Sequence, residues 1–338
     1  MKKHANIPIF IPHLGCPNQC VFCNQRTISG VGDFRAECVI DIIDSHLKTI
    51  GEGVDTEIAF FGGSFTGIEH SLMIRLLEIA NAYIKSGRVS RIRCSTRPDY
   101  INEDILLELK KYGVEVIELG LQSADDNVLS ITKRGHSFDD ERAACELILK
   151  HGFTLVGQMM IGLPGASEES EIKTAEFIIS QGASFARIYP TVVFKNTELC
   201  CMTERGEYIP ISLEDAVRRS ARVKKMFIDA GVEVIRIGLC ATENLTSRDT
   251  YFAGPNHPAI GELVENEIYY SIIKKELSVF CKNYDGDDVT VYIPRASLSK
   301  AGGQKNKNKL RLQKEFLLSN IRFLEKEELS EYCISIER

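Results

Sequence analysis

Strand-like and helix-like segments alternate along most of this chain, and the alternation restricts the folds that it can adopt. Six short apolar segments, rich in β-branched and aromatic residues, have the pattern of buried strands; they cover residues 7–13, 57–62, 91–96, 116–122, 155–161 and 185–193. Segments with apolar residues at helical spacing lie between them. Such a series implies a parallel sheet with helices outside. We therefore predict an α/β fold with a partial (β/α)6 barrel; a flat doubly wound sheet is the alternative.

The pattern changes after about residue 245, which indicates a second domain. A helix over 213–230 and a short strand over 233–237 still continue the alternation. Beyond them, the spacing predicts a long helix over 259–277, followed by strand-like runs over 288–294 and 320–325. We predict a barrel domain over 1–245 and a small α+β C-terminal extension over 246–338.

Composition is that of an ordinary globular enzyme from a reducing compartment. The 338 residues include 11 cysteines, an odd number in a chain too large to need disulfide staples, so we expect thiols or metal ligands. No secretory leader opens the sequence, and no apolar run reaches the roughly 18 residues that span a membrane. We expect a cytoplasmic protein without membrane contact. The formal net charge of −6 gives no general argument for nucleic-acid binding.

Three cysteines follow the first predicted strand within eight residues. Three residues separate Cys16 from Cys20, and two separate Cys20 from Cys23, so their thiolates can converge on one metal centre. Three protein ligands on a four-iron cluster leave one iron open. The spacing leaves two alternatives: a zinc site with His13 or Cys38 as the fourth ligand, and a redox dithiol of Cys20 and Cys23.

Residues suited to ligand binding follow the second and third predicted strands. In parallel α/β folds, the site lies at the carboxyl ends of the strands. Gly62-Gly63 lets a ligand approach the backbone closely. The hydroxyls and the guanidinium of Ser95-Thr96-Arg97 suit ribose and carboxylate groups. A simple strand-to-helix turn and a helix cap are the competing structural interpretations.

The later strands add polar residues at the same expected edge. Glu118 and Gln122 lie in an otherwise apolar strand, where a buried carboxylate needs a partner such as an arginine or a ligand ammonium. Tyr189 is a candidate for relaying a proton or a hydrogen atom, and His136 is a candidate catalyst. A buried hydrogen-bonded tyrosine and a locally hydrogen-bonded loop histidine are the structural alternatives.

Cys16, Cys20 and Cys23, with the aromatic Phe22 before the last of them, resemble the signature of the radical S-adenosylmethionine (SAM) superfamily. The resemblance implies a 4Fe–4S cluster on these cysteines, with SAM chelating its open iron. It implies reductive cleavage of SAM to a 5′-deoxyadenosyl radical, with a low-potential ferredoxin or flavodoxin as electron donor. The residues expected to bind the cofactors are Phe22, Gly62, Gly63, Ser64, Ser95, Thr96, Arg97, Glu118, Gln122, Ser123, Gly162 and Leu163.

Further strings resemble one branch of that superfamily, the radical SAM domain of the Elongator catalytic subunit and its stand-alone bacterial relatives. The most specific are Arg97-Pro98-Asp99-Tyr100 and Arg134-Gly135-His136. The resemblance implies tRNA as a substrate. The roughly 90 residues after the barrel are too few for the remainder of the barrel plus an acetyltransferase domain, and the first two cysteines are closer than in Elongator-type enzymes. We therefore do not predict acetyl-CoA-dependent uridine carboxymethylation.

A basic run over 295–314 is the expected tRNA contact, although a solvated surface is the usual role of such runs. It contains Arg295, Lys300, Lys305, Lys307, Lys309, Arg311 and Lys314 and no acidic residue. Two other functions stay open: a radical SAM oxidoreductase on a small molecule, similar to the coproporphyrinogen oxidase group, and a cluster-bearing RNA-binding protein without catalysis. Buried thiols are the expectation for Cys200, Cys201 and Cys240, and no role is predicted for them.

Overall fold

The computed structural model describes residues 4–11, 14–16, 20–24, 34–239, 249–284 and 286–337. His13 and Cys240 lie outside these residues. The chain divides into two compact units, one of residues 1–212 and 226–256 and one of residues 213–225 and 257–338. The predicted domain boundary at residue 245 stays a prediction. No helix in the described parts of the chain has the length and apolarity needed to span a bilayer.

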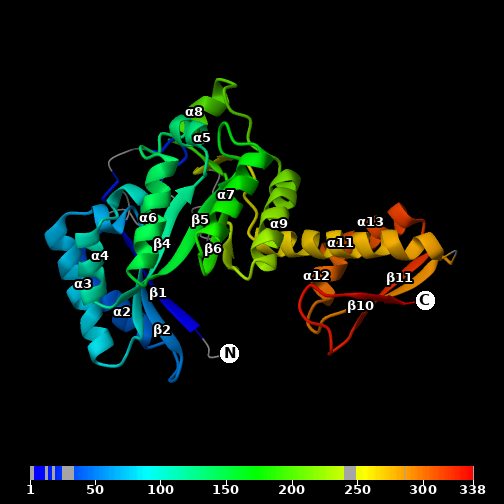
Figure 1. Ribbon diagram of the computed structural model, residues 1–338, viewed down its shortest axis with the longest axis horizontal. Helices are drawn as coiled ribbons and strands as arrows, with labels where there is room; N and C mark the ends of the chain where they lie inside the picture. Colours follow the sequence, from blue (N-terminus) through cyan, green and yellow to red (C-terminus); the bar gives the residue numbers. More distant parts are fainter. Residues whose placement is uncertain are drawn as a thin grey trace. The chain divides into compact units, whose positions relative to one another are not determined.

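The first unit contains a curled sheet of seven parallel strands, an α/β half-barrel (Figure 1). The strands are β1 (His4–Ile11), β2 (Asp55–Gly62), β3 (Arg91–Thr96), β4 (Val114–Gln122), β5 (Thr154–Ile161), β6 (Phe185–Pro190) and β8 (Glu233–Ile237). They lie side by side in chain order, without the change of direction that a doubly wound sheet requires. The predicted partial barrel is confirmed.

One predicted strand is wrong in its final part. The sequence indicates a continuous strand over 185–193, but β6 ends at Pro190 and a separate strand β7 (Val193–Phe194) pairs antiparallel with β9 (Tyr251–Ala253). Pro190 has no backbone N–H to continue a ladder. The next amide, of Thr191, instead donates to the Ile161 carbonyl at 2.8 Å.

Helices cover the outer face of the sheet (Figure 1). They are α2 (Val39–Leu47), α3 (His70–Lys85), α4 (Glu103–Lys111), α6 (Phe138–Lys150) and α7 (Glu168–Ser180). The short helices α5 (Asp126–Ile131) and α8 (Glu198–Glu204) lie instead beside residues 20–23, and α9 (Leu213–Asp229) is divided between the two units. Short 3-10 turns cover Ala36–Cys38, Phe65–Gly67 and Pro98–Tyr100. Ser137 and Ser167 begin α6 and α7 with reciprocal capping boxes, which fixes where these helices start.

The core lies between the sheet and this helical layer. Ile58 and Phe60 of β2 are fully buried, and Phe60 stacks on Phe65 with ring centroids 4.5 Å apart. Helix α7 approaches β5 so closely that a Cβ on Gly157 would lie 2.6 Å from Ile178. Close packing of this kind holds the strand ends, and the turns that follow them, in fixed positions.

The second unit is an α+β fold, as predicted. Its sheet has β10 (Asp288–Ile293) in the centre, with β11 (Asn320–Glu325) parallel on one side and β12 (Ser335–Glu337) antiparallel on the other. Its helices are α11 (Ile260–Phe280), α12 (Leu298–Gly302) and α13 (Lys307–Phe316), and 3-10 turns cover Cys281–Asn283 and Gln304–Asn306. Tyr269, Ile273, Leu277, Val289, Val291, Ile293 and Leu312 form the centre of its apolar core.

Candidate active site

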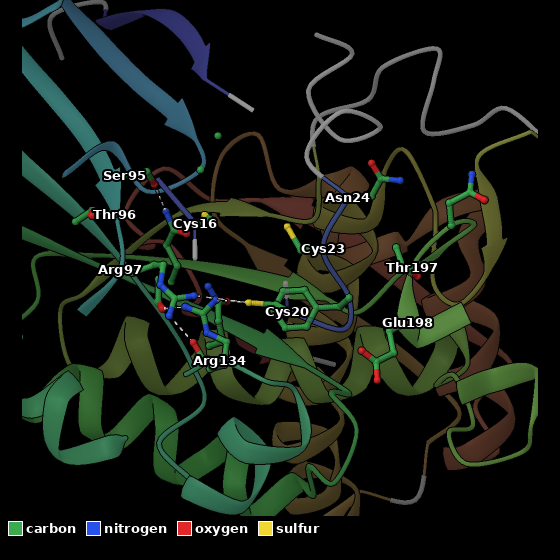
Figure 2. Close-up of a pocket in the computed structure, with 17 residues that line it drawn as sticks. Cys16, Cys20, Cys23, Asn24, Ser95, Thr96, Arg97, Arg134, Thr197 and Glu198 are labelled. Atoms are coloured by element: carbon green, nitrogen blue, oxygen red, sulfur yellow. Dashed lines mark hydrogen bonds between the residues drawn. The ribbon is translucent and has the colours of Figure 1, made fainter. Parts of the chain in front are cut away.

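A cavity of about 640 Å³ lies in the first unit at the carboxyl ends of β2, β3, β4 and β5 (Figure 2). The side chains of Cys16, Cys20 and Cys23 all line it. Of the other residues predicted to bind the cofactors, Phe22, Gly62, Gly63, Ser95, Thr96, Arg97 and Gln122 line it as well. Predicted site residues from four separate segments of the chain therefore share one concave surface.

The cysteine loop is held by distant parts of the chain. The Val21 amide donates to the Thr132 carbonyl at 3.2 Å, and the Val21 carbonyl accepts from the Leu199 amide at 2.8 Å. Val21 is buried with Leu199 and Cys200 of helix α8. The Cys23 amide also donates to the Cys20 carbonyl at 3.0 Å. These bonds fix the direction of the loop where Cys20 and Cys23 project into the cavity.

The Gly62-Gly63 turn packs directly against the cysteine loop. Gly62 has φ +115°, a conformation that a side chain disfavours. A Cβ on Gly63 would lie 2.2 Å from the Leu14 carbonyl oxygen and 3.4 Å from the Cys16 sulfur. The glycine motif is therefore required for contact between the two loops, in addition to any ligand that it binds.

Ser64 and Thr96 form a hydroxyl cluster behind the cavity surface. Their oxygens lie 2.8 Å apart, and the Thr66 hydroxyl lies 2.6 Å from that of Thr96. The Arg97 amide donates to the Ser64 hydroxyl at 3.3 Å. Thr96 lines the cavity, whereas Ser64 is buried behind it. Ser64 thus connects the turn after β2 to the turn after β3.

Two arginines direct guanidinium groups at Cys20 (Figure 2). Nη1 of Arg134 lies 3.2 Å from the Cys20 sulfur and Nη1 of Arg97 lies 3.8 Å from it. Asp99 accepts from Arg97 Nε at 2.9 Å and from Nη2 at 3.0 Å. Arg97 also donates to the Arg134 carbonyl, and Arg134 donates to the Gly120 carbonyl. Cationic donors of this kind favour negative charge on the sulfur.

His136 lies behind the arginines and does not line the cavity. Its Nε2 is 3.1 Å from a carboxylate oxygen of the buried Glu141, and its Nδ1 is 3.6 Å from Asp99. Burial lowers the pKa of His136 and raises the pKa of Glu141 well above its usual range. Burial alone would raise the pKa of Asp99, but His136 and Arg97 hold it below its usual range. A catalytic role for His136 stays a prediction.

Buried charges cross the inner face of the sheet below the cavity. Glu118 accepts hydrogen bonds from Arg93 at 2.9 Å, from Arg187 at 2.7 Å and from Gln158 at 2.8 Å. The Tyr189 hydroxyl accepts from Arg187 at 3.3 Å, and burial raises the pKa of Tyr189. Neither Glu118 nor Tyr189 lines the cavity. Gln158 connects these buried charges to the cavity, because it lines the cavity and donates to Glu118.

Gln122 has a strained backbone conformation at the cavity surface. Its φ is +75°, and the ladder between β4 and β5 shifts register at this point. It lines the cavity, and its Oε1 is buried without a hydrogen-bond partner in the described part of the chain. A buried acceptor of this kind needs a partner, and a bound ligand is one way to supply it.

The remaining predicted contacts lie outside the cavity surface. Ser123 is buried next to Gln122. The Gly162-Leu163 turn is held by the chain itself: the Gly162 amide donates to Glu171 at 2.7 Å, and the Gly162 carbonyl accepts from the Tyr208 hydroxyl at 2.6 Å. Contact between this turn and a cofactor stays a prediction.

Seven residues of the cavity surface were not predicted as site residues: Asn24, Gly120, Arg134, Gln158, Asn196, Thr197 and Glu198. Thr197 begins helix α8, where its hydroxyl accepts from the Cys200 amide at 3.2 Å. Asn-Thr-Glu before an apolar run is a readable helix start. Its position beside the cysteines depends on long-range packing, which no local pattern encodes.

The cavity holds the three thiols that a cluster on three cysteine ligands requires, but in the described residues they are not gathered into a preformed metal-binding group. Three cysteines share the cavity, two guanidinium groups face one of them, and Gln122 offers an unpaired acceptor. Cys38, considered as a fourth zinc ligand, is exposed and does not line the cavity, and His13 lies outside the described residues. Within the residues that the structure describes, no three His, Cys, Asp or Glu side chains form a group able to hold a metal ion.

Two family profiles match the chain. The profile described as the radical SAM superfamily matches residues 10–178, which is half of the chain. The profile described as a radical SAM C-terminal domain matches residues 183–270. The first match includes all three cysteines of the cavity and the turns after β2, β3, β4 and β5.

Two of the curated relatives are longer than this chain. The tRNA uridine(34) acetyltransferase of Methanocaldococcus infernus is 34% identical over 243 residues, which are 60% of this chain and 46% of that protein. Human Elongator complex protein 3 is 32% identical over 203 residues, 52% of this chain and 36% of that protein. The chain thus spans less than half the length of these relatives.

A solved structure has the same fold. The archaeal Elp3 of Methanocaldococcus infernus, lacking its N-terminal segment, superimposes with a TM-score of 0.63 at 23% identity. The match covers 84% of this chain and 68% of that chain.

Proposed function

The chain belongs to the radical SAM superfamily, and on that basis we propose that it is an enzyme that cleaves SAM reductively at a 4Fe–4S cluster held by Cys16, Cys20 and Cys23. The observation that carries the proposal is the shared cavity: the three cysteines line one surface with the turns after β2, β3 and β4. When bound, the cluster supplies an open iron for SAM and the electron that splits its sulfonium into methionine and a 5′-deoxyadenosyl radical.

The protein's own groups suit the polar parts of SAM. Gly62 and Gly63 line the cavity without side chains, so the amino acid moiety can approach the backbone there closely. The hydroxyls of Ser95 and Thr96 suit ribose or carboxylate oxygens. The free Oε1 of Gln122 is an acceptor for a ribose hydroxyl or an ammonium group. As reductant we propose a low-potential ferredoxin or flavodoxin.

The test is formation of 5′-deoxyadenosine. Protein reconstituted anaerobically with iron and sulfide is reduced and incubated with SAM, and the products are separated by chromatography. We expect 5′-deoxyadenosine and methionine from the wild-type protein and neither from the triple variant C16A/C20A/C23A. A wild-type protein that holds a cluster but releases no 5′-deoxyadenosine would contradict the proposal and favour a cluster-bearing binding protein.

We propose tRNA as the substrate class. The archaeal relative is named as a tRNA uridine(34) acetyltransferase, although this chain covers only 46% of it. The second unit adds a basic surface, whose cations fall into two sets. Arg295, Lys300 and Arg311 are paired with Glu327, Glu331 and Glu267. Lys305, Lys307, Lys309 and Lys314 have no carboxylate partner among the described residues, which leaves their charge available to phosphates.

Binding of tRNA is tested by a mobility shift repeated over a range of salt concentrations. We expect affinity to fall steeply as salt rises, because lysine–phosphate contacts release counterions. SAM cleavage without salt-dependent tRNA binding would overturn tRNA as the substrate class and leave a small-molecule substrate for the same radical chemistry.

A further inference from the structure

Two buried arginines face the sulfur of one cysteine; Arg97 is among the residues predicted above to bind the cofactors, and Arg134 is not. We propose that Arg97 and Arg134 are positioning residues that act through Cys20 and raise the reduction potential of the cluster. The inference rests on the proposed function, because it assumes that Cys20 is a cluster ligand.

Both guanidinium groups lie within hydrogen-bonding distance of the Cys20 sulfur. Arg134 Nη1 lies 3.2 Å from the Cys20 sulfur, and Arg97 Nη1 lies 3.8 Å from it. Both arginines and Cys20 are at most 8% exposed, so water screens these interactions little. Asp99 accepts from Nε and Nη2 of Arg97, and the Gly120 carbonyl accepts from Nη2 of Arg134. Nε of Arg134 has no partner among the described residues.

A set of polar contacts behind the arginines, with Asp99 at its exposed edge and His136 and Glu141 buried, keeps them in place. Arg97 donates to the carbonyl of Arg134, which ties the two residues to each other. Asp99 contacts His136 at 3.6 Å, and His136 contacts the fully buried Glu141 at 3.1 Å. The strings Arg97-Pro98-Asp99 and Arg134-Gly135-His136, far apart in sequence, therefore form one structure whose cationic side faces Cys20.

The negative charge that reduction adds to the cluster determines the direction of the expected shift in reduction potential. One electron from an external chemical reductant enters the cluster, and no bond breaks and no proton moves. The added negative charge is shared with the cysteine sulfurs, so N–H donors at a sulfur stabilise the reduced state more than the oxidised state. Removing a donor therefore lowers the reduction potential.

The experiment is an EPR-monitored redox titration of reconstituted protein with dithionite. We expect Arg97→Gln and Arg134→Gln each to reduce the equilibrium constant for cluster reduction by about tenfold, which is 59 mV for a one-electron couple. Lys133→Gln is the matched control, since Lys133 is next to Arg134 in sequence but its exposed ammonium pairs with Glu198. Its potential should equal that of the wild-type protein.

Variants that hold the cluster at the wild-type potential would overturn the proposal, and so would a Lys133→Gln shift as large as theirs. A second measurement needs no variant: ENDOR spectra of the reduced wild-type cluster in H2O and D2O should detect exchangeable protons beside it. Their absence would also overturn the proposal. A wild-type protein that takes up no cluster contradicts the proposed function itself, whereas SAM cleavage with unchanged potentials contradicts only the role of the arginines.

Discussion

The wall of the cavity at Cys20 and the basic segment of the second unit were both selected from the sequence, but they are built differently. At Cys20, specific hydrogen bonds hold the two arginines: Asp99 accepts from Arg97, and the Gly120 carbonyl accepts from Arg134. In the basic segment, some cations are neutralised by carboxylates and others are not. A motif with fixed spacing therefore predicts a geometry, whereas a run of like charges predicts only a composition.

Loss of the cysteines is the change with the largest expected effect. Replacing Cys16, Cys20 or Cys23 with Ala removes one of the three proposed thiolate ligands from the cavity. We expect cluster assembly to be abolished, measured as iron and sulfide content and visible absorbance after anaerobic reconstitution. Cys38→Ala, at an exposed position away from the cavity, is the control and should assemble normally. An unchanged spectrum in the triple variant would show that the ligands are elsewhere.

Glu118→Gln tests the buried charges below the cavity. The substitution leaves Arg93 and Arg187 without their shared carboxylate. Breaking a buried ion pair costs about 3–5 kcal/mol, so we expect a loss of this size in the free energy of unfolding, measured by urea denaturation. Glu103→Gln breaks the exposed pair with Lys150, which water screens, and should leave the free energy of unfolding nearly unchanged. Equal losses of unfolding free energy in the two variants would contradict the burial of the Glu118 ion pairs.

Gly63→Ala tests the contact between the glycine turn and the cysteine loop. The added methyl group would lie 2.2 Å from the Leu14 carbonyl, so one of the two loops must move. Overpacking of this kind costs about 1–3 kcal/mol, and we expect less iron per chain. Gly51→Ala is the control, because a Cβ there meets no atom within 4 Å. Wild-type iron content and stability in Gly63→Ala would rule out the interlocked arrangement.

Measurements of tRNA affinity distinguish the two sets of cations in the basic segment. We expect weaker tRNA binding when Gln replaces Lys305, Lys307, Lys309 and Lys314. The slope of log affinity against log salt concentration should become shallower by roughly 3, if each lysine neutralises about one phosphate. Replacing the paired Arg295, Lys300 and Arg311 should change the slope less, because their charge is already balanced. The reverse order of effects would contradict the distinction between the two sets.

The sequence predicted the parts of the site that depend on local pattern. Strand β3 and strand β8 begin and end where predicted, and the turns after β2, β3 and β4 lie at one cavity. Residues whose role depends on distant contacts were missed. Arg134 acts on a cysteine 114 positions away, and Thr197 reaches the cavity only because α8 packs on Val21. Pro190 could have indicated the end of β6 from the sequence, but the apolar residues around it favoured a continuous strand over 185–193.

The coordination of iron tests the central claim most directly. We propose that the three cysteines leave one iron of a 4Fe–4S cluster open to SAM. Mössbauer spectra of protein reconstituted with 57Fe should show one iron of the four changing its parameters when SAM is added, while the other three keep theirs. Four irons that all remain unchanged on addition of SAM, in protein that carries a complete cluster, would contradict the account.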